Sequence, residues 1–118
     1  MSDAPAADPI VIEATDTGVV ARLNLKLLDD RSLTRMDEMV DKAACGRAGA
    51  TNIVLDMSRV QIVPSLGLGL LLTLMKKYKE RGQHVKLAAV QPQVRTAMAI
   101  TKLDQILDLY DTVEAAGR

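Results

Sequence analysis

The chain has 118 residues, which is enough for one domain with its own core and leaves no room for a second. Fifteen basic and fifteen acidic residues cancel, so no net field favours nucleic acid, and 48% apolar residues indicate a globular domain rather than a disordered chain. With two Tyr and no Phe or Trp, the core must be built from aliphatic side chains and Met.

The cysteine content and the N-terminus point to a cytoplasmic protein. Because Cys45 is the single cysteine, no internal disulfide can form, which fits a reducing compartment. We interpret Cys45 as a small apolar side chain on the buried side of its helix. Residues 1–8 lack the segments of a signal peptide, so we expect a flexible tail and then one domain over residues 9–118. The longest apolar run, residues 66–72, is too short to cross a bilayer, so we expect no membrane insertion.

Two β-rich runs and an amphipathic helix are predicted first. Residues 10–12 and 19–23, separated by a turn-like segment, predict an antiparallel pair at one edge of a sheet. A helix follows, with either Asp29 or Asp30 as its N-cap. Its apolar positions recur at helical spacing until two glycines end the pattern: Leu33, Met36, Met39, Val40, Ala43 and Ala44, then Gly46 and Gly49.

Strands and helices alternate in the remainder of the chain. Residues 52–56 are a short apolar run that ends in Asp56, as in a central buried strand. Residues 57–64 predict a loop, although 59–63 would also suit a short strand. The later elements are a helix at 66–81 stopped by Gly82, a strand at 85–90, a helix starting near Pro92 with Val94, Ala97, Met98 and Thr101 facing inward, a strand at 106–110 and a helix at 112–116.

This order of elements predicts an α/β fold. Strand, strand, helix and then three further strand–helix pairs make one domain with a mixed, mostly parallel sheet of four to five strands packed with about four helices. We expect the later strands to be parallel and joined by right-handed crossovers.

Residues that could carry catalysis or bind a cofactor are sparse. His84 and Cys45 stand at unrelated positions, so no metal site is expected. A catalytic triad of Ser65, His84 and Asp56 is disfavoured. His84 is expected at the start of a strand, which lies at the opposite end of the sheet from the carboxyl ends of the strands. We interpret His84 as a surface residue.

Nucleotide and phosphoacceptor sites are also disfavoured. The segment from Gly67 to Gly69 lacks the third glycine and the lysine of phosphate-binding loops. Asp56 has no acidic partners at the end of the first strand to hold Mg²⁺, so we interpret it as a structural acid at a strand–loop junction. We therefore expect no cofactor and no enzymatic activity.

The helix that begins after Ser65 is apolar on more than one face. One stripe at helical spacing contains Leu68, Leu71, Leu72 and Met75, and a second contains Leu66, Leu70 and Leu74. The second stripe fits either a partner surface or extra burial. The last turn, with Lys76, Lys77, Lys79, Glu80 and Arg81, is interpreted as solvated.

Ser65 permits a structural and a functional interpretation. As the expected N-cap, its hydroxyl would accept from the amide of Gly67 or Leu68. As an exposed hydroxyl at a helix N-terminus it would also be a site for phosphorylation, since free amides and the helix dipole tolerate a dianion. A phosphate beside apolar side chains would repel a partner without a large conformational change.

Residues 55–71 resemble the signature of the STAS family, in which a D-x-S-x-V run, here from Asp56, leads to a serine and then G-L-G at a helix start. The C-terminal segments from Val94 to Thr101 and from Tyr110 to Ala116 are similar to the last two helices of the family, so the resemblance covers residues 9–116. It implies an anti-sigma factor antagonist of bacterial transcription regulation that works by partner switching.

In such proteins the unphosphorylated antagonist binds an anti-sigma factor that is also a serine kinase, and a sigma factor is released. Phosphorylation of the signature serine, here Ser65, breaks the complex, and a PP2C-type phosphatase restores it. The resemblance implies a monomer or weak dimer and a contact surface that contains Asp56, Ser58, Pro64, Ser65, Leu66, Gly67, Leu68, Gly69 and Leu70.

The chain departs from the family pattern beside the phosphoacceptor. The family often has Asp before the serine and a small residue after it, where this chain has Pro64 and Leu66. These differences bear on kinase recognition, whereas the hydroxyl is retained. An alternative function is a non-catalytic scaffold subunit in a stressosome-like or transporter-associated complex, with Ser65 serving only as a cap.

Overall fold

A single five-stranded sheet organises the computed structural model, which describes residues 9–44 and 51–117. The strands lie in sequence order: β1 (Ile10–Ala14), β2 (Gly18–Leu23), β3 (Asn52–Asp56), β4 (His84–Ala88) and β5 (Asp108–Tyr110). β1 is antiparallel to β2, and every later pair is parallel. The predicted mixed sheet and its antiparallel edge pair are confirmed. The expected N-terminal tail, Cys45, Gly46 and Gly49 lie outside the described residues.

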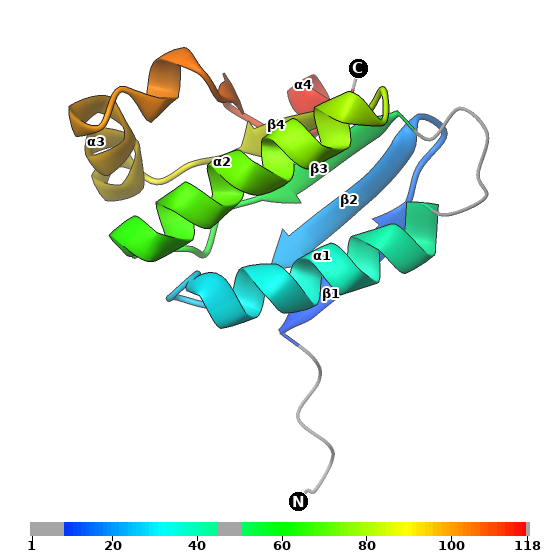
Figure 1. Cartoon of the computed structure of the whole chain (residues 1–118), viewed down its shortest axis with the longest axis horizontal. Coiled ribbons are helices and arrows are strands. Elements are labelled where there is room, and N and C mark those ends of the chain that lie inside the picture. The colour runs from blue at the N-terminus through cyan, green and yellow to red at the C-terminus, as the bar shows by residue number, and fades with distance from the viewer. Residues whose placement is uncertain (1–8, 45–50, 118) are drawn as a thin grey trace, which may run out of the picture.

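Helices cover both faces of this sheet. α1 (Asp30–Ala44) and α2 (Ser65–Glu80) lie side by side on one face, and the short α4 (Val113–Ala116) lies on the other (Figure 1). α3 (Pro92–Ile100) and a 3-10 turn at Leu103–Gln105 connect β4 to β5. The predicted set of four helices is confirmed. In α3, Val94 and Met98 are buried as expected, whereas Thr101 is exposed at its C-terminus.

α1 begins where its sequence supplies a cap. The Asp29 carboxylate accepts from the Ser32 amide at 2.9 Å, so Asp29 is the N-cap of the two candidates. The same hydrogen bond lowers the pKa of Asp29 below its usual value. Leu33, Met36 and Val40 share one face of the helix and are buried.

The central strand β3 is buried on both faces. Ile53 and Leu55 pack into the main core under α1 and α2, while Val54 packs toward Ala116 of α4. The buried amide of Asn52 donates to the Ala116 carbonyl oxygen at 3.2 Å, which ties α4 to the sheet. A continuous apolar run is therefore the expected sequence for this strand.

Ion pairs join α1 to α2 across their exposed edges. Lys77 donates to Asp37 at 2.8 and 3.0 Å and to Asp41 at 3.3 Å, and Arg81 donates to Asp41 at 2.7 Å. The buried Tyr78 donates its hydroxyl to Asp37. From the sequence, the last turn of α2 is interpreted as solvated. That interpretation is wrong for Lys77 and Arg81, because α1 presents Asp37 and Asp41 opposite them.

The connections before α2 and before β5 settle two expectations. Residues 57–64 form the predicted loop rather than the alternative strand at 59–63, because Gln61 and Ile62 both donate to the Lys26 carbonyl oxygen and only an isolated bridge joins Leu27 to Ile62. The last strand is shorter than expected because Lys102, with φ 62°, turns the chain into the 3-10 segment before β5.

Candidate functional site

Ser65 is the first residue of α2, and the residue before it makes the turn into the helix. Pro64 has φ −61° and ψ 160°, and its carbonyl oxygen accepts from the Leu68 amide at 2.9 Å. The expectation that Ser65 caps the helix is wrong, because Pro64 holds the extended conformation of a cap and Ser65 is already helical. The Ser65 side chain is exposed, and its hydroxyl makes no hydrogen bond within residues 9–44 and 51–117.

The backbone around this hydroxyl favours negative charge. As the first three residues of α2, Ser65, Leu66 and Gly67 have N–H groups with no acceptor inside the helix. The helix dipole places partial positive charge at the same end. A phosphate on Ser65 would therefore be tolerated by the folded chain.

A close approach at Gly67 fixes the start of α2. A Cβ atom at this position would lie 2.8 Å from the Leu28 carbonyl oxygen and 3.3 Å from the Val63 side chain. The first turn of α2 is thus pressed against the loop that leads from β2 into α1. Gly69, half a turn further on, has nothing within 4 Å of such a Cβ.

Exposed apolar side chains gather at this end of the molecule. Leu27, Ile62 and Leu66 are 45%, 58% and 68% exposed. Leu27 and Ile62 pair in the isolated bridge, and the Leu28 amide donates to the Ile62 carbonyl oxygen at 2.9 Å. Two segments that are distant in sequence, the loop after β2 and the segment leading into α2, therefore present apolar surface beside Ser65, which is unfavourable for a chain that remains unpartnered.

The second apolar stripe of α2 is divided between core and surface. Leu74 is buried, Leu70 is half-buried and Leu66 is exposed. Along this stripe runs a shallow groove of about 570 Å³ between α1 and α2, lined by Asp30, Thr34, Ser65, Leu66, Gly69, Leu70 and Thr73. Extra burial explains the distal part of the stripe, and the end next to Ser65 is open.

Asp56 organises the loop that leads toward Ser65. Its carboxylate accepts from the Ser58 amide at 3.1 Å and pairs with the Arg22 guanidinium at 3.1 Å. Arg22 also pairs with Glu13 at 2.8 Å, and this hydrogen bond is the main cause that raises the pKa of Arg22. These contacts agree with the interpretation of Asp56 as a structural acid at a strand–loop junction.

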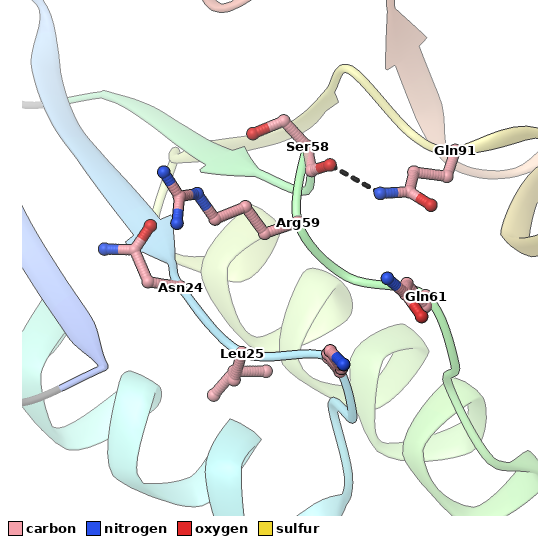
Figure 2. Close-up of a pocket in the computed structure, with 7 residues that line it drawn as sticks. Asn24, Leu25, Ser58, Arg59, Gln61 and Gln91 are labelled. Carbon is pink, nitrogen blue, oxygen red and sulfur yellow. Dashed lines mark hydrogen bonds between the residues drawn. The ribbon is translucent and has the colours of Figure 1, made fainter.

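A polar cleft of about 480 Å³ adjoins this loop at the carboxyl ends of β2, β3 and β4. Figure 2 shows the Arg59 side chain reaching toward Asn24 across it. The side-chain amide of Gln91 donates to the Ser58 backbone carbonyl oxygen at 2.6 Å and so ties the loop after β4 to the loop after β3. The lining residues are Asn24, Leu25, Lys26, Ser58, Arg59, Gln61 and Gln91.

The residues predicted for the contact surface occupy three environments. Those exposed are Ser58, Ser65, Leu66 and Gly69; those half-buried are Asp56, Pro64 and Leu70; those buried are Gly67 and Leu68. Residues that sequence reasoning missed are Lys26, Leu27, Arg59, Ile62 and Gln91. Their shared signal is position, because each follows a parallel strand, and the carboxyl ends of such strands meet at one edge.

Catalytic groups do not converge at this end of the sheet. His84 pairs in register with Asn52, whereas Asp56 pairs with Ala88. His84 therefore lies at the amino end of the parallel strands and Asp56 at their carboxyl end. Among the described residues, no three His, Cys, Asp or Glu side chains are grouped as metal ligands. No helix within residues 9–44 and 51–117 has the length and apolar character needed to span a membrane.

Comparisons with known proteins agree on one family. The STAS domain model matches residues 10–116. A Thermotoga neapolitana protein named as a candidate anti-sigma factor antagonist is 30% identical over 80 residues, which cover 68% of this chain and 66% of that protein, just under two thirds of its length.

Solved structures share the fold at lower identity. The unphosphorylated anti-sigma factor antagonist SpoIIAA is 23% identical, with a TM-score of 0.65 over 92% of this chain and 93% of that one. A murine anion transporter, solute carrier 26 family member A9, is 16% identical, with a TM-score of 0.70 over 91% of this chain and 21% of that one. The family model covers nearly the whole of the described fold, and the chain belongs to the STAS domain family.

Proposed function

We propose that this chain is an anti-sigma factor antagonist that binds an anti-sigma factor with serine kinase activity and is released when that kinase phosphorylates Ser65. The observation that carries the proposal is the exposed Ser65 hydroxyl, which starts α2, has no hydrogen-bond partner among the described residues and adjoins the exposed Leu66. Within residues 9–44 and 51–117, no hydrogen bond accounts for a hydroxyl in this position.

Phosphorylation would act on the partner rather than on the fold. The amides at the start of α2 stabilise the dianion. In the complex, by contrast, the added charge would be desolvated against the apolar surface of Leu27, Ile62 and Leu66. A penalty on the order of several kcal/mol is expected for such burial, and every 1.4 kcal/mol changes the affinity about tenfold.

The remaining features of the proposal follow from partner switching. A PP2C-type phosphatase would restore the binding form, and the chain itself would bind without turnover in the cytoplasm. SpoIIAA, which has this fold, has been solved in unphosphorylated and phosphorylated forms, and this supports a fold that tolerates both states. The surface members of the predicted site, Ser58, Ser65, Leu66 and Gly69, would make the contact.

A second candidate function is a scaffold subunit in a stable complex. It is favoured by the occurrence of the same fold within a murine anion transporter, of which this chain spans 21%. In a scaffold the apolar surface beside Ser65 would be a permanent interface. Binding would then be independent of ATP and of the chemical state of Ser65.

The two functions are separated by the affinity of Ser65 variants for the anti-sigma factor kinase of the same organism. Ser65→Glu should weaken binding at least about tenfold, since charge is added beside the apolar contact. Ser65→Ala should bind as the wild type does and should become insensitive to ATP. Isothermal titration calorimetry measures the affinities, and circular dichroism melting checks that each variant folds.

The matched control is Thr96→Glu, which adds the same charge on α3. Thr96 is exposed, and its hydroxyl donates to the Pro92 carbonyl oxygen of its own helix at 2.9 Å. This variant should bind as the wild type does. Equal affinities for wild type, Ser65→Glu and Thr96→Glu would contradict the switch and favour the scaffold.

A further inference from the structure

The cleft at the carboxyl ends of β2, β3 and β4 contains two positively charged side chains without a counter-charge. Lys26 and Arg59 are both exposed, and neither makes an ion pair with any described residue. Arg22, at the carboxyl end of β2, is by contrast paired with Glu13 and Asp56. The charges of the whole chain cancel, whereas this cleft is locally positive.

Asp56, the acid at the strand end beside the cleft, is already paired. The Asp56 carboxylate is held by Arg22 and by the Ser58 amide, each at 3.1 Å. The remaining polar lining is neutral and consists of the side chains of Asn24, Ser58, Gln61 and Gln91. An incoming carboxylate would therefore meet hydrogen-bond donors and two free cations, with no competing acid in the lining.

The two cations belong to loops that are fixed to one another. The Lys26 carbonyl oxygen accepts from the amides of Gln61 at 2.8 Å and Ile62 at 3.0 Å. Gln91 closes the other side by its hydrogen bond to the Ser58 carbonyl oxygen (Figure 2). These hydrogen bonds fix the loops that frame the cleft, so only the long side chains of Lys26 and Arg59 have to be ordered on binding.

Exposed apolar surface continues directly from the cleft. Leu27 follows Lys26, Ile62 follows Gln61, and the two apolar residues pair in the isolated bridge. A small anion would fill the cleft and leave these side chains in water. A protein surface would cover the charged cleft and the apolar residues together, as in interfaces that combine an apolar centre with a charged rim.

We propose that Lys26 and Arg59 recognise acidic side chains of the partner protein that docks at Ser65, with Leu27 and Ile62 covered by apolar residues of the same partner. The inference rests on the proposed function for the identity of the partner, and it adds the chemistry of that partner's surface. The Arg59 guanidinium offers bidentate hydrogen bonds to a carboxylate, and Lys26 supplies a second point charge.

The first test compares charge reversal in the cleft with charge reversal elsewhere. Lys26→Glu combined with Arg59→Glu should lower the affinity for the anti-sigma factor kinase about tenfold or more, and should remove most of the loss of affinity seen between about 0.05 M and about 0.5 M NaCl. Lys42→Glu combined with Lys79→Glu changes the net charge equally at exposed residues outside the cleft and should bind as the wild type does.

The outcomes separate this inference from the proposed function. If Ser65→Glu weakens the complex while the cleft reversal has the affinity and salt dependence of the wild type, the acidic contact is refuted and the phosphorylation switch stands. If the cleft reversal and the control reversal weaken binding equally, the effect is one of net charge and the inference also fails.

A second measurement tests whether the cleft binds acidic side chains, and it does not depend on binding of the kinase. Backbone amide resonances are followed by NMR during titration with a short polyglutamate peptide, a polyglutamine peptide and inorganic phosphate. Polyglutamate should shift the resonances of Lys26, Ser58, Arg59 and Gln61, and the cleft reversal should abolish these shifts. Shifts spread equally to Lys42 and Lys79, or the same shifts from phosphate at lower concentration than from polyglutamate, would overturn the inference.

Discussion

Gly67 and Gly69 lie in the same turn of α2 and differ in what surrounds them. Gly67→Ala should lower the free energy of unfolding, because the new Cβ would lie 2.8 Å from the Leu28 carbonyl oxygen. Gly69→Ala should raise it by up to about 1 kcal/mol, because its surroundings are open and alanine favours the helix. Urea unfolding of both variants measures the difference, and equal stabilities would contradict the close approach at Gly67.

Residue identities alone did not reveal how Ser65 is placed. A serine before a glycine-containing helix suggests a cap, and the proline before that serine was not considered as the cap. The structure places the cap one residue earlier because Pro64 has the required extended conformation. A shift of one residue leaves the hydroxyl without a bond to its own helix, and it is this freedom that supports Ser65 as a modification site.

At the scale of elements, the buried Tyr78 joins α2 to α1 through Asp37. Burial, followed by the hydrogen bond to Asp37, raises the pKa of the Tyr78 phenol. Tyr78→Phe should lower the free energy of unfolding by about 1 to 2 kcal/mol at neutral pH, because a hydrogen bond to a carboxylate is lost. The folded wild type keeps its phenolic proton, whereas the unfolded chain ionises near pH 10.

The raised pKa fixes the sign of the pH dependence. The contribution of Tyr78 to stability is fully present below about pH 10 and is lost as the pH rises above that value. The stability gap between wild type and Tyr78→Phe should therefore narrow in alkaline solution. Urea unfolding of wild type and Tyr78→Phe across the pH range measures this gap. Parallel profiles for wild type and Tyr78→Phe would contradict this role.

Periodicity predicted the elements better than it predicted their contacts. The spacing of Leu33, Met36 and Val40 identified the buried face of α1, and the apolar run of β3 identified its central place. The pairs between Lys77, Arg81 and the acids of α1 were missed, because pairing across two helices depends on their packing. The loop predicted at 57–64 is confirmed, and the alternative strand at 59–63 does not form because its neighbour is the loop at Lys26 rather than a strand.

At the scale of the whole molecule, the sheet order decides what meets at the candidate site. Parallel pairing aligns Arg22, Asp56 and Ala88 across the strands, so the loops after β2, β3 and β4 come together. The signature segment around Ser65 could be located from sequence, because it is continuous. Lys26 and Arg59 could not, since their shared cleft depends on the order of the strands and on the bridge between two loops.

The measurement that tests the central claim most directly is the position of the phosphate after reaction with the partner kinase. The purified chain is incubated with the anti-sigma factor kinase of the same organism and Mg²⁺-ATP, and then with a PP2C-type phosphatase, and intact mass and fragment masses are recorded. The account predicts the gain of one phosphoryl group on Ser65, its removal by the phosphatase, and no gain in Ser65→Ala. A chain that stays unmodified, or a phosphate on Ser58 instead, would contradict it.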